Sequence, residues 1–223
     1  GTELVLIPGG RFWLGSEEND CDAYDDEKPR HLHCISPFYL ALYCVTVAQF
    51  RCFINETNYD GGELWRQDPD DHPVRYVSWL DVHAYCEWSQ LRLPYEAEWE
   101  LAARGYQGFR YPWGDTWPEG GKVHWDRHSL LTETTKVHDY ADGVSPFGAY
   151  QMSGNLWEWC LDSWDTISYK RYASGKFRPL DQAGVQLRGA RCASWTDQDP
   201  REFRGAHRSF SIDQNQRYPN FGF

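Results

Sequence analysis

The chain has little positive charge. Its 223 residues include 22 lysines and arginines against 33 aspartates and glutamates, a formal net charge of −11. Because proteins that bind nucleic acids need lysine and arginine to displace counterions from the phosphate backbone, this balance argues against a nucleic-acid partner. It disfavours an anionic membrane surface for the same reason. The acidic excess by itself serves solubility.

Long apolar runs are missing too. No segment approaches the roughly 20 consecutive apolar residues that a transmembrane helix needs, and no signal peptide starts at Gly1. We therefore expect no membrane insertion. The compartment stays open, with the cell surface or the extracellular space favoured.

The cysteines lack the spacings that mark a framework of disulfide bonds. The seven cysteines are an odd number and contain no C-x-x-C pair; they are Cys21, Cys34, Cys44, Cys52, Cys86, Cys160 and Cys192. This pattern is typical neither of a small disulfide-stapled domain nor of a zinc ribbon. We expect most of these side chains to be small buried hydrophobes.

Motifs of common catalytic sites are also missing. The chain has no Gly-x-Ser-x-Gly elbow and no glycine-rich phosphate loop. His124 and His128 have the i, i+4 spacing of a zinc pair, but their segment has weak helix signals, so we interpret them as solvated loop histidines. His31 and His33 would share one face of a strand with Cys34 on the other, which counts against a metal site there.

Aromatic residues, by contrast, are abundant. Tryptophan, tyrosine and phenylalanine make up 17% of the chain, against a single methionine. Such sequences, punctuated by glycine and proline, bury rigid flat side chains among loops rather than stacking aliphatic helices. The length suffices for one sizeable core, and no Ser/Gly linker marks a boundary, so we expect a single domain over residues 1–223.

Regular elements are expected mainly in the first half of the chain. Capping signals predict three helices. The first starts after Thr46, the second starts after Ser78, and the third spans Glu96–Arg104. Gly105 would end the third helix. Short strands are predicted on both sides of a bend at residues 8–10, and again over residues 36–43. Beyond Gly105 we expect turns, short strands and aromatics, but no helix.

Three segments combine tryptophan and carboxylate, and two of them also glycine, more densely than an ordinary helix or sheet requires. They are Leu93–Glu100 (LPYEAEWE), Tyr111–Asp115 (YPWGD) and Gly154–Trp159 (GNLWEW). Their order and spacing resemble the formylglycine-generating-enzyme domain, the sulfatase-modifying-factor family, and the resemblance covers essentially the whole chain. It implies an α+β, C-type lectin-like fold with few helices, short strands and many loops. Because this fold hosts both enzymes and non-catalytic binders, it does not imply an activity.

The same resemblance implies a calcium site. In the family, a side chain three residues before the glycine, two backbone carbonyls and the glutamate hold the ion; carried over, the ligands are Gln151, Gly154, Leu156 and Glu158. Such mixed carbonyl and carboxylate oxygens suit calcium. Gln151 stands where the family generally has Asn or Asp. The alternative is that Trp157 and Trp159 are core residues and Glu158 caps a neighbouring backbone. We expect no organic cofactor.

The C-terminal segment bears on enzymatic activity. Copper-dependent members of the family need two thiols shortly after a Gly-Gly-Ser-Tyr or Gly-Gly-Ser-Trp element, and the corresponding stretch here is Leu187–Trp195 (LRGARCASW). Cys192 precedes the tryptophan, and no cysteine follows Trp195. A metal–thiolate oxidase lacks its chemistry without these thiols. The related iron enzymes need a three-histidine set and a further helical domain, which this chain also lacks.

Residues 194–223 also resemble the variable region of a diversity-generating-retroelement protein. Serine, tryptophan, arginine and glycine residues form a skeleton at Ser194-Trp195, Arg204–Arg208 and Phe221–Phe223. Randomised adenines in asparagine codons yield the Ser, Phe, Ile, Asp, His, Tyr, Thr and Pro found between them. The codons of the four intervening Gln and Glu residues would be constant or of other origin.

This second resemblance implies a function in binding. A rigid scaffold that carries mixed aromatic and small polar side chains resembles an adaptable paratope. The candidate contact residues are Thr196, Asp197, Asp199, His207, Ser209, Phe210, Ser211, Ile212, Tyr218 and Asn220. We therefore predict a non-catalytic protein whose C-terminal face binds a macromolecular ligand, a protein above all. The alternatives are a copper-dependent oxidase, and a degenerate relative with an arbitrary C-terminal surface.

Overall fold

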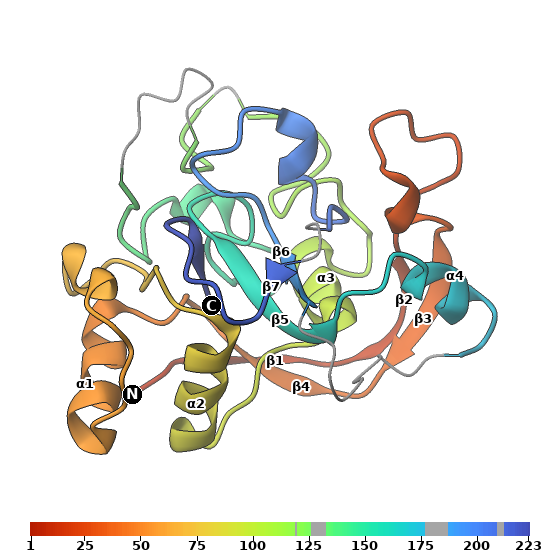
Figure 1. The fold of residues 1–223 in the computed structure, drawn as a ribbon. Coiled ribbons are helices and arrows are strands. Elements are labelled where there is room, and N and C mark those ends of the chain that lie inside the picture. Colours follow the sequence, from red (N-terminus) through yellow and green to blue (C-terminus); the bar gives the residue numbers. More distant parts are fainter. Residues whose placement is uncertain (119, 126–132, 177–186, 209–211) are drawn as a thin grey trace.

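In a computed structural model of the chain, short strands and a few helices are joined by long loops (Figure 1). The structure describes residues 1–118, 120–125, 133–176, 187–208 and 212–223. The strands are β1 (Leu4–Ile7), β2 (Gly10–Leu14), β3 (His31–Ile35), β4 (Phe38–Ala41), β5 (Trp157–Ser163), β6 (Leu187–Arg191), β7 (Ile212–Asp213) and β8 (Phe221–Gly222). The α-helices in these ranges are α1 (Val47–Thr57), α2 (Trp79–Ser89), α3 (Glu96–Arg104) and α4 (Ser168–Ala173).

The N-terminal strands form two separate antiparallel ribbons. β1 pairs with β4, and β2 pairs with β3. The predicted bend lies between β1 and β2, where Gly9 has a φ of 69° and a Cβ would come within 2.5 Å of the Ser36 carbonyl carbon. Only glycine fits such a close approach in the left-handed region, which explains why the chain turns there.

The C-terminal half forms a four-stranded sheet in the order β7-β6-β5-β8. β5 and β6 are antiparallel, whereas β5 and β8 run parallel. The last strand therefore lies beside a strand that begins more than sixty residues earlier, as Figure 1 shows. This pairing anchors the C-terminal segment to the centre of the molecule.

The three predicted helices are present, and capping explains their starts. Thr46 and Gln49 form a reciprocal capping box for α1, and Ser78 and Asp81 form another for α2. Each box satisfies backbone N–H groups that a first helical turn leaves free. α3 ends at Gly105, whose N–H donates to the Leu101 carbonyl. These starts and stops confirm the predicted positions.

The prediction of no helix beyond Gly105 is wrong. The six-residue α4 begins without a side-chain cap. Its Tyr169 and Tyr172 are buried, and their rings contact His31 on β3. Short helices owe their stability to such tertiary packing rather than to local propensity, which is why local signals missed this one.

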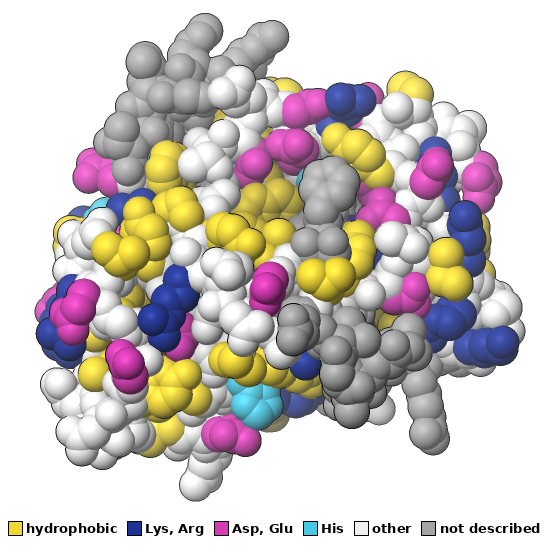
Figure 2. All heavy atoms as spheres, viewed as in Figure 1, with side chains coloured by type: hydrophobic (Ala, Val, Ile, Leu, Met, Phe, Trp, Pro, Cys, Tyr) yellow, Lys and Arg dark blue, Asp and Glu magenta, His cyan; other side chains and the backbone are white. Residues whose placement is uncertain are grey.

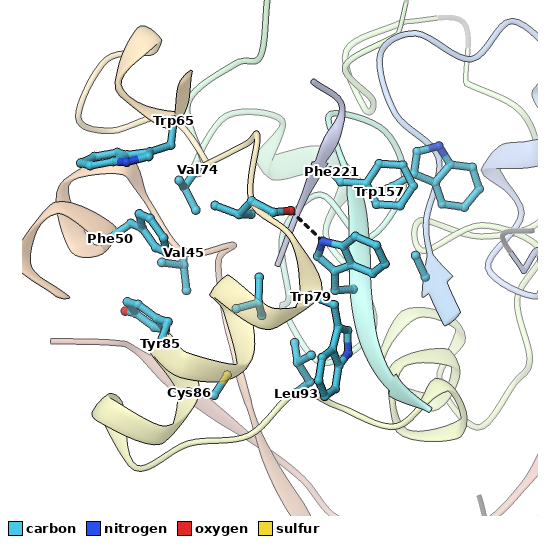
Figure 3. Packing of buried hydrophobic residues seen from close by; sticks show 14 of the residues in the cluster. Val45, Phe50, Trp65, Val74, Trp79, Tyr85, Cys86, Leu93, Trp157 and Phe221 are labelled. Atoms are coloured by element: carbon cyan, nitrogen blue, oxygen red, sulfur yellow. Dashed lines mark hydrogen bonds between the residues drawn. The ribbon is translucent and has the colours of Figure 1, made fainter. Parts of the chain in front are cut away.

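The core is as aromatic as the composition predicts. One buried cluster joins α1, α2 and β5, with Phe50, Trp79 and Tyr85 among the side chains drawn in Figure 3. Two buried indole N–H groups of this cluster donate to backbone: Trp79 Nε1 to the Cys160 carbonyl at 2.8 Å, and Trp159 Nε1 to the Val77 carbonyl at 3.1 Å. These two rings thus contribute apolar area without leaving their polar atom unpaired.

The structure also bears on the burial of the cysteines and on membrane-spanning helices. The expectation that most cysteines are buried is wrong, because Cys21, Cys34 and Cys52 are exposed and Cys44 is only partly buried. In the described part of the chain, no helix is long and apolar enough to span a membrane.

Candidate binding face at the C-terminus

A frame of buried ion pairs holds the C-terminal segment against α3 and the N-terminal loops. Arg208 donates to both carboxylate oxygens of Glu96 at 2.7 and 2.9 Å, and Arg204 does the same with Glu27 at 2.6 Å. Both arginines are 2% exposed. Two parallel N–H···O bonds fix distance and orientation together. Two arginines of the skeleton, Arg204 and Arg208, are therefore buried supports of the segment.

Arg191 on β6 completes this frame. It donates to Glu100 at 2.8 Å and to the Gly205 carbonyl at 2.7 Å. Burial would raise the pKa of Glu100, but the charges of Arg191 and Arg104 outweigh burial and lower the pKa to about 2. The carboxylate is therefore ionised throughout the neutral range, and the frame stays intact there.

A polar cluster lies at the start of the segment. The Asp197 carboxylate accepts from the Ser194 N–H at 2.6 Å and from its hydroxyl at 2.8 Å. The Asn220 amide donates to the Ser194 hydroxyl at 3.2 Å and to the Thr196 hydroxyl at 3.0 Å. The structure thus brings together Thr196, Asp197 and Asn220, three of the predicted contact residues.

Glu202 adds a second carboxylate that the sequence reading did not select. It lies in the 3₁₀ turn Pro200–Phe203, and burial together with the charge of Asp197 raises its pKa to about 7. Burial also raises the pKa of Asp197. Two neighbouring carboxyl groups resist double ionisation, so these two hold a proton more readily than solvated ones. The available signal in the sequence was the five-residue spacing between Asp197 and Glu202, but this spacing brings the two carboxyl groups together only once the turn has folded.

Tryptophans from a distant segment border the cluster. Trp125 Nε1 donates to the Asp197 carbonyl at 2.7 Å, and the Trp117 ring packs edge-on against Trp125 and Phe203. Both tryptophans are partly accessible. Figure 2 shows hydrophobic and acidic side chains mixed over the upper part of this view, where the Pro200–Phe203 turn lies in Figure 1. We call the surface of Trp117, Trp125, Thr196, Asp197, Glu202 and Asn220 the C-terminal face.

His207 corrects the predicted contact set. It is 3% exposed, its Nδ1 lies 2.8 Å from the Glu202 carbonyl, and its ring packs between Tyr24 and Trp157. Burial lowers its pKa to about 4, so it is neutral at pH 7. His207 is therefore part of the supporting frame. Because His207 lies in the chain between Arg204 and Arg208, which are both buried, it is buried with them.

The other predicted contacts are less exposed than expected. Asp199 caps the 3₁₀ turn by accepting from the Arg201 N–H at 2.9 Å. Ile212 pairs with Arg188 across β7 and β6, and Tyr218 packs on Phe221. All three are half-buried, as are Thr196, Asp197 and Asn220. Ser209, Phe210 and Ser211 lie outside the described residues.

Cys192, the thiol that precedes Trp195, is enclosed by protein. Cys192 is 2% exposed, and its Sγ lies 3.4 Å from the Gly154 carbonyl oxygen and 3.6 Å from that of Gln151. Burial, with the nearby charge of Glu158, raises the pKa of this thiol well above its ordinary value. Since the thiolate is the metal ligand and nucleophile, Cys192 is a poor candidate for either role.

The predicted calcium ligands are largely engaged with protein groups. The Gln151 amide nitrogen donates to the carbonyls of Lys136 and Asp139, and its oxygen accepts from Asn155 at 2.6 Å. The Gly154 carbonyl already accepts from the Leu156 N–H and faces the Cys192 thiol. Calcium takes six to eight oxygen ligands, so a bound ion would have to replace these contacts of Gln151. Calcium at the predicted set stays a prediction.

Glu158 lies in an unusual environment for a carboxylate. Its oxygens accept from Trp99 Nε1 at 2.7 Å and from the Cys44 thiol at 3.5 Å, both neutral donors. Enclosure by protein raises the pKa of Glu158 to about 7, although these two hydrogen bonds lower it. The alternative that Glu158 caps a backbone group is not what these contacts show. Trp157 and Trp159 are buried core residues, as that alternative expected.

The histidine candidates also have protein partners. His124 Nε2 lies 2.9 Å from the Glu133 carbonyl and its Nδ1 3.2 Å from the Tyr140 hydroxyl, while His128 lies outside the described residues. His31 and His33 lie on one face of β3 with Cys34 on the other, as predicted; the two histidines are buried and Cys34 is exposed. Within the described ranges, one group has metal-ligand spacing, Asp20, Cys21 and Asp22, and Arg110 already pairs with both carboxylates.

Comparisons with known proteins agree with this architecture. The model of the sulfatase-modifying factor enzyme 1-like domain matches residues 1–223. The formylglycine-generating enzyme of Thermomonospora curvata is 32% identical, over 72% of this chain and 71% of its own. The inactive Cα-formylglycine-generating enzyme 2 of Bos taurus is 30% identical, over 88% and 77%.

A solved structure confirms the fold. Treponema denticola variable protein 1 superposes with a TM-score of 0.74 at 20% identity, over 99% of this chain and 92% of its own. At this identity the likeness shows the fold, and the predicted irregular α+β, C-type lectin-like architecture is confirmed. Because the domain model spans every residue, the chain belongs to the sulfatase-modifying-factor, or formylglycine-generating-enzyme, family.

Proposed function

We propose that this chain is a non-catalytic member of its family that binds a macromolecular ligand, a protein on another cell, virus or host, through the C-terminal face. The observation that carries the proposal is the absence of any cysteine after Trp195. The carboxylates Asp197 and Glu202 lie in that segment instead, and the preceding thiol, Cys192, is enclosed.

The construction of the face supports binding. The frame of Arg191, Arg204 and Arg208 holds the backbone from below, while half-buried polar and aromatic groups reach the surface. A rigid support beneath accessible side chains reduces the ordering cost of binding. Tryptophans such as Trp117 and Trp125 are frequent anchors at protein interfaces.

The relatives support both halves of the proposal. One of them is named as an inactive enzyme, so loss of the oxidase chemistry has occurred on this fold. A neighbour in structure is named as a variable protein, so the fold also tolerates sequence variation. An oxidase remains the alternative, because the active formylglycine-generating enzyme is equally similar in sequence.

A copper assay separates the two functions. The purified chain, loaded with Cu(I) under oxygen, is expected to leave the cysteine of a sulfatase-motif peptide unchanged in mass. Peptide oxidation above a protein-free control would favour the oxidase. In that case Cys192→Ser should abolish both turnover and tight Cu(I) binding, whereas Cys34→Ser, at an exposed cysteine, should change neither.

The diversification itself has a genomic test. If residues 194–223 are a variable region, an asparagine-rich near-copy of their codons should lie close to a reverse-transcriptase gene. If the neighbourhood of the gene has neither feature, the C-terminal face is a binding face whose sequence is not diversified. Calcium at Glu158 stays a prediction: removal of calcium by a chelator should lower the melting temperature of the native chain and leave that of Glu158→Gln unchanged.

A further inference from the structure

A separate cavity lies between the β1–β4 ribbon and the C-terminal end of α2. It has a volume of about 530 Å³, within the range of roughly 300–1,000 Å³ that small-molecule sites occupy. Strand β4, the loop that follows it and residues 90–94 after α2 all contribute to its lining. Val45, Tyr85, Cys86 and Leu93, which Figure 3 labels, are among the lining residues. None of the six residues of the C-terminal face lines this cavity.

Large apolar side chains contribute much of the lining, and some of them remain exposed to solvent. The leucines among them are Leu4, Leu40, Leu42, Leu91 and Leu93. Leu4 is 43% exposed, Tyr39 66% and Leu91 40%. Exposed apolar groups that gather around a cavity, unlike scattered ones, mark a site of interaction. An occupant that covers these side chains would remove their apolar surface from water.

The lining also contains polar groups, most of which offer a ligand no free charge. Both terminal nitrogens of Arg92 donate to the carboxylate of Glu98 at 2.7 Å, so these two side chains form a neutral pair. Displacing either member would leave the other uncompensated. Thr2 and Gln90 line the cavity as well and are uncharged. A charged ligand group beside these four residues would lose its hydration without gaining a partner.

We propose that this cavity binds an uncharged small molecule with an apolar body and at most one or two polar groups. The apolar body would lie against the leucines and rings of the lining, and its transfer from water is the main stabilising contribution. A hydroxyl or carbonyl group of the ligand has two uncharged partners in the lining, Thr2 and Gln90. Glu158 also lines the cavity, but the site uses neither its charge nor the calcium predicted there. The site is likewise independent of the function proposed for the C-terminal face.

A series of 1-alkanols tests the proposal by calorimetry. From 1-butanol to 1-octanol, each added methylene group should tighten binding by about fourfold, because the lining removes it from water. Octylamine and octanoate carry the same apolar chain with a charge of either sign. Each should bind at least about tenfold more weakly than 1-octanol, since its charge would be buried without a partner. The titrations are run with calcium and with a chelator, and the alcohol should bind most tightly in both.

Two matched pairs of variants locate the site. Leu4 and Leu6 are both exposed leucines of β1, and of these two only Leu4 lines the cavity. Leu91 and Leu80 are exposed leucines near the two ends of α2, and of these two only Leu91 lines it. Leu4→Asp and Leu91→Asp should each weaken the binding of 1-octanol by about fivefold or more. Leu6→Asp and Leu80→Asp should change it by less than about twofold.

Three results would overturn the proposal. The first is an affinity for 1-alkanols that does not increase with chain length. The second is octylamine or octanoate binding as tightly as 1-octanol, with or without calcium. The third is an equal loss of 1-octanol binding in the two members of each matched pair. Melting curves show which of the four variants are folded, and if one pair is lost to misfolding the other pair still decides.

Discussion

The buried carboxylates beside β5 and α3 are accommodated in opposite ways. The frame matches each of two carboxylates with an arginine: Glu100 with Arg191 and Glu96 with Arg208. Glu158, which lies opposite Arg191 in the β5–β6 register, has only neutral hydrogen-bond donors. Paired charges hold a backbone in place, because removing one partner leaves the other uncompensated. An unpaired charge is available to a ligand.

The frame should be the most sensitive part of the molecule. Replacing Arg208 by methionine leaves Glu96 without its bidentate partner, so we expect a loss of about 3–5 kcal/mol in the free energy of unfolding. Urea unfolding followed by tryptophan fluorescence measures it. The matched control is Arg201→Met, at an exposed arginine paired with Asp199, which should cost under about 1 kcal/mol. Similar losses in both variants would mean that Arg208 does not support the fold.

Lowering the pH should destabilise the protein through two buried histidines. The pKa of His207 and that of His33 are lowered to about 4 by burial, below the ordinary value of 6.5. Because the folded state favours the neutral rings, their contribution is complete above pH 6.5 and is lost as the pH falls toward 4. For His207 alone this amounts to about 3 kcal/mol.

Melting curves between pH 7.5 and 4.5 check this expectation, with His207→Gln as the comparison. As the pH falls from about 6.5 to 4.5, the melting temperature of the native chain should fall relative to that of the variant, in which position 207 no longer titrates. A pH dependence that is unchanged in His207→Gln would show that other groups control the acid response.

The polar cluster on the C-terminal face should be the most tolerant region. Replacing Thr196, Asp199 and Asn220 together by alanine removes half-buried hydrogen bonds but no buried charge. The cost should be under about 1 kcal/mol per site. Chemical unfolding of the triple variant measures the sum. If this variant does not fold, these side chains are core and the proposed binding face cannot vary independently of stability.

Sequence reasoning was most reliable where the responsible interactions are local. The helix starts at Thr46 and Ser78 follow from capping groups three residues apart, and both are in place. The alternation along residues 31–34 likewise predicted that His31 and His33 share one face of β3, with Cys34 on the other. Such signals need no knowledge of what the element packs against.

The failures share a cause in long-range contacts. α4 is stabilised by tyrosines that pack on a strand more than 130 residues earlier in the chain. His207 looked like a variable surface residue, yet Trp157 and Tyr24 enclose it. None of these partners can be identified from spacing alone.

By itself, the amino-acid sequence determined the family, the aromatic core, the three capped helices and the absence of thiols beyond Trp195, because each depends on residue identity or on neighbours within a few positions. Only the tertiary structure decided which charges are paired. Glu100 meets Arg191 across 91 residues, whereas Glu158 meets a thiol across 114 and no cation. Whether a carboxylate supports the fold or remains available to a ligand depends on what folding places within a few ångströms of it.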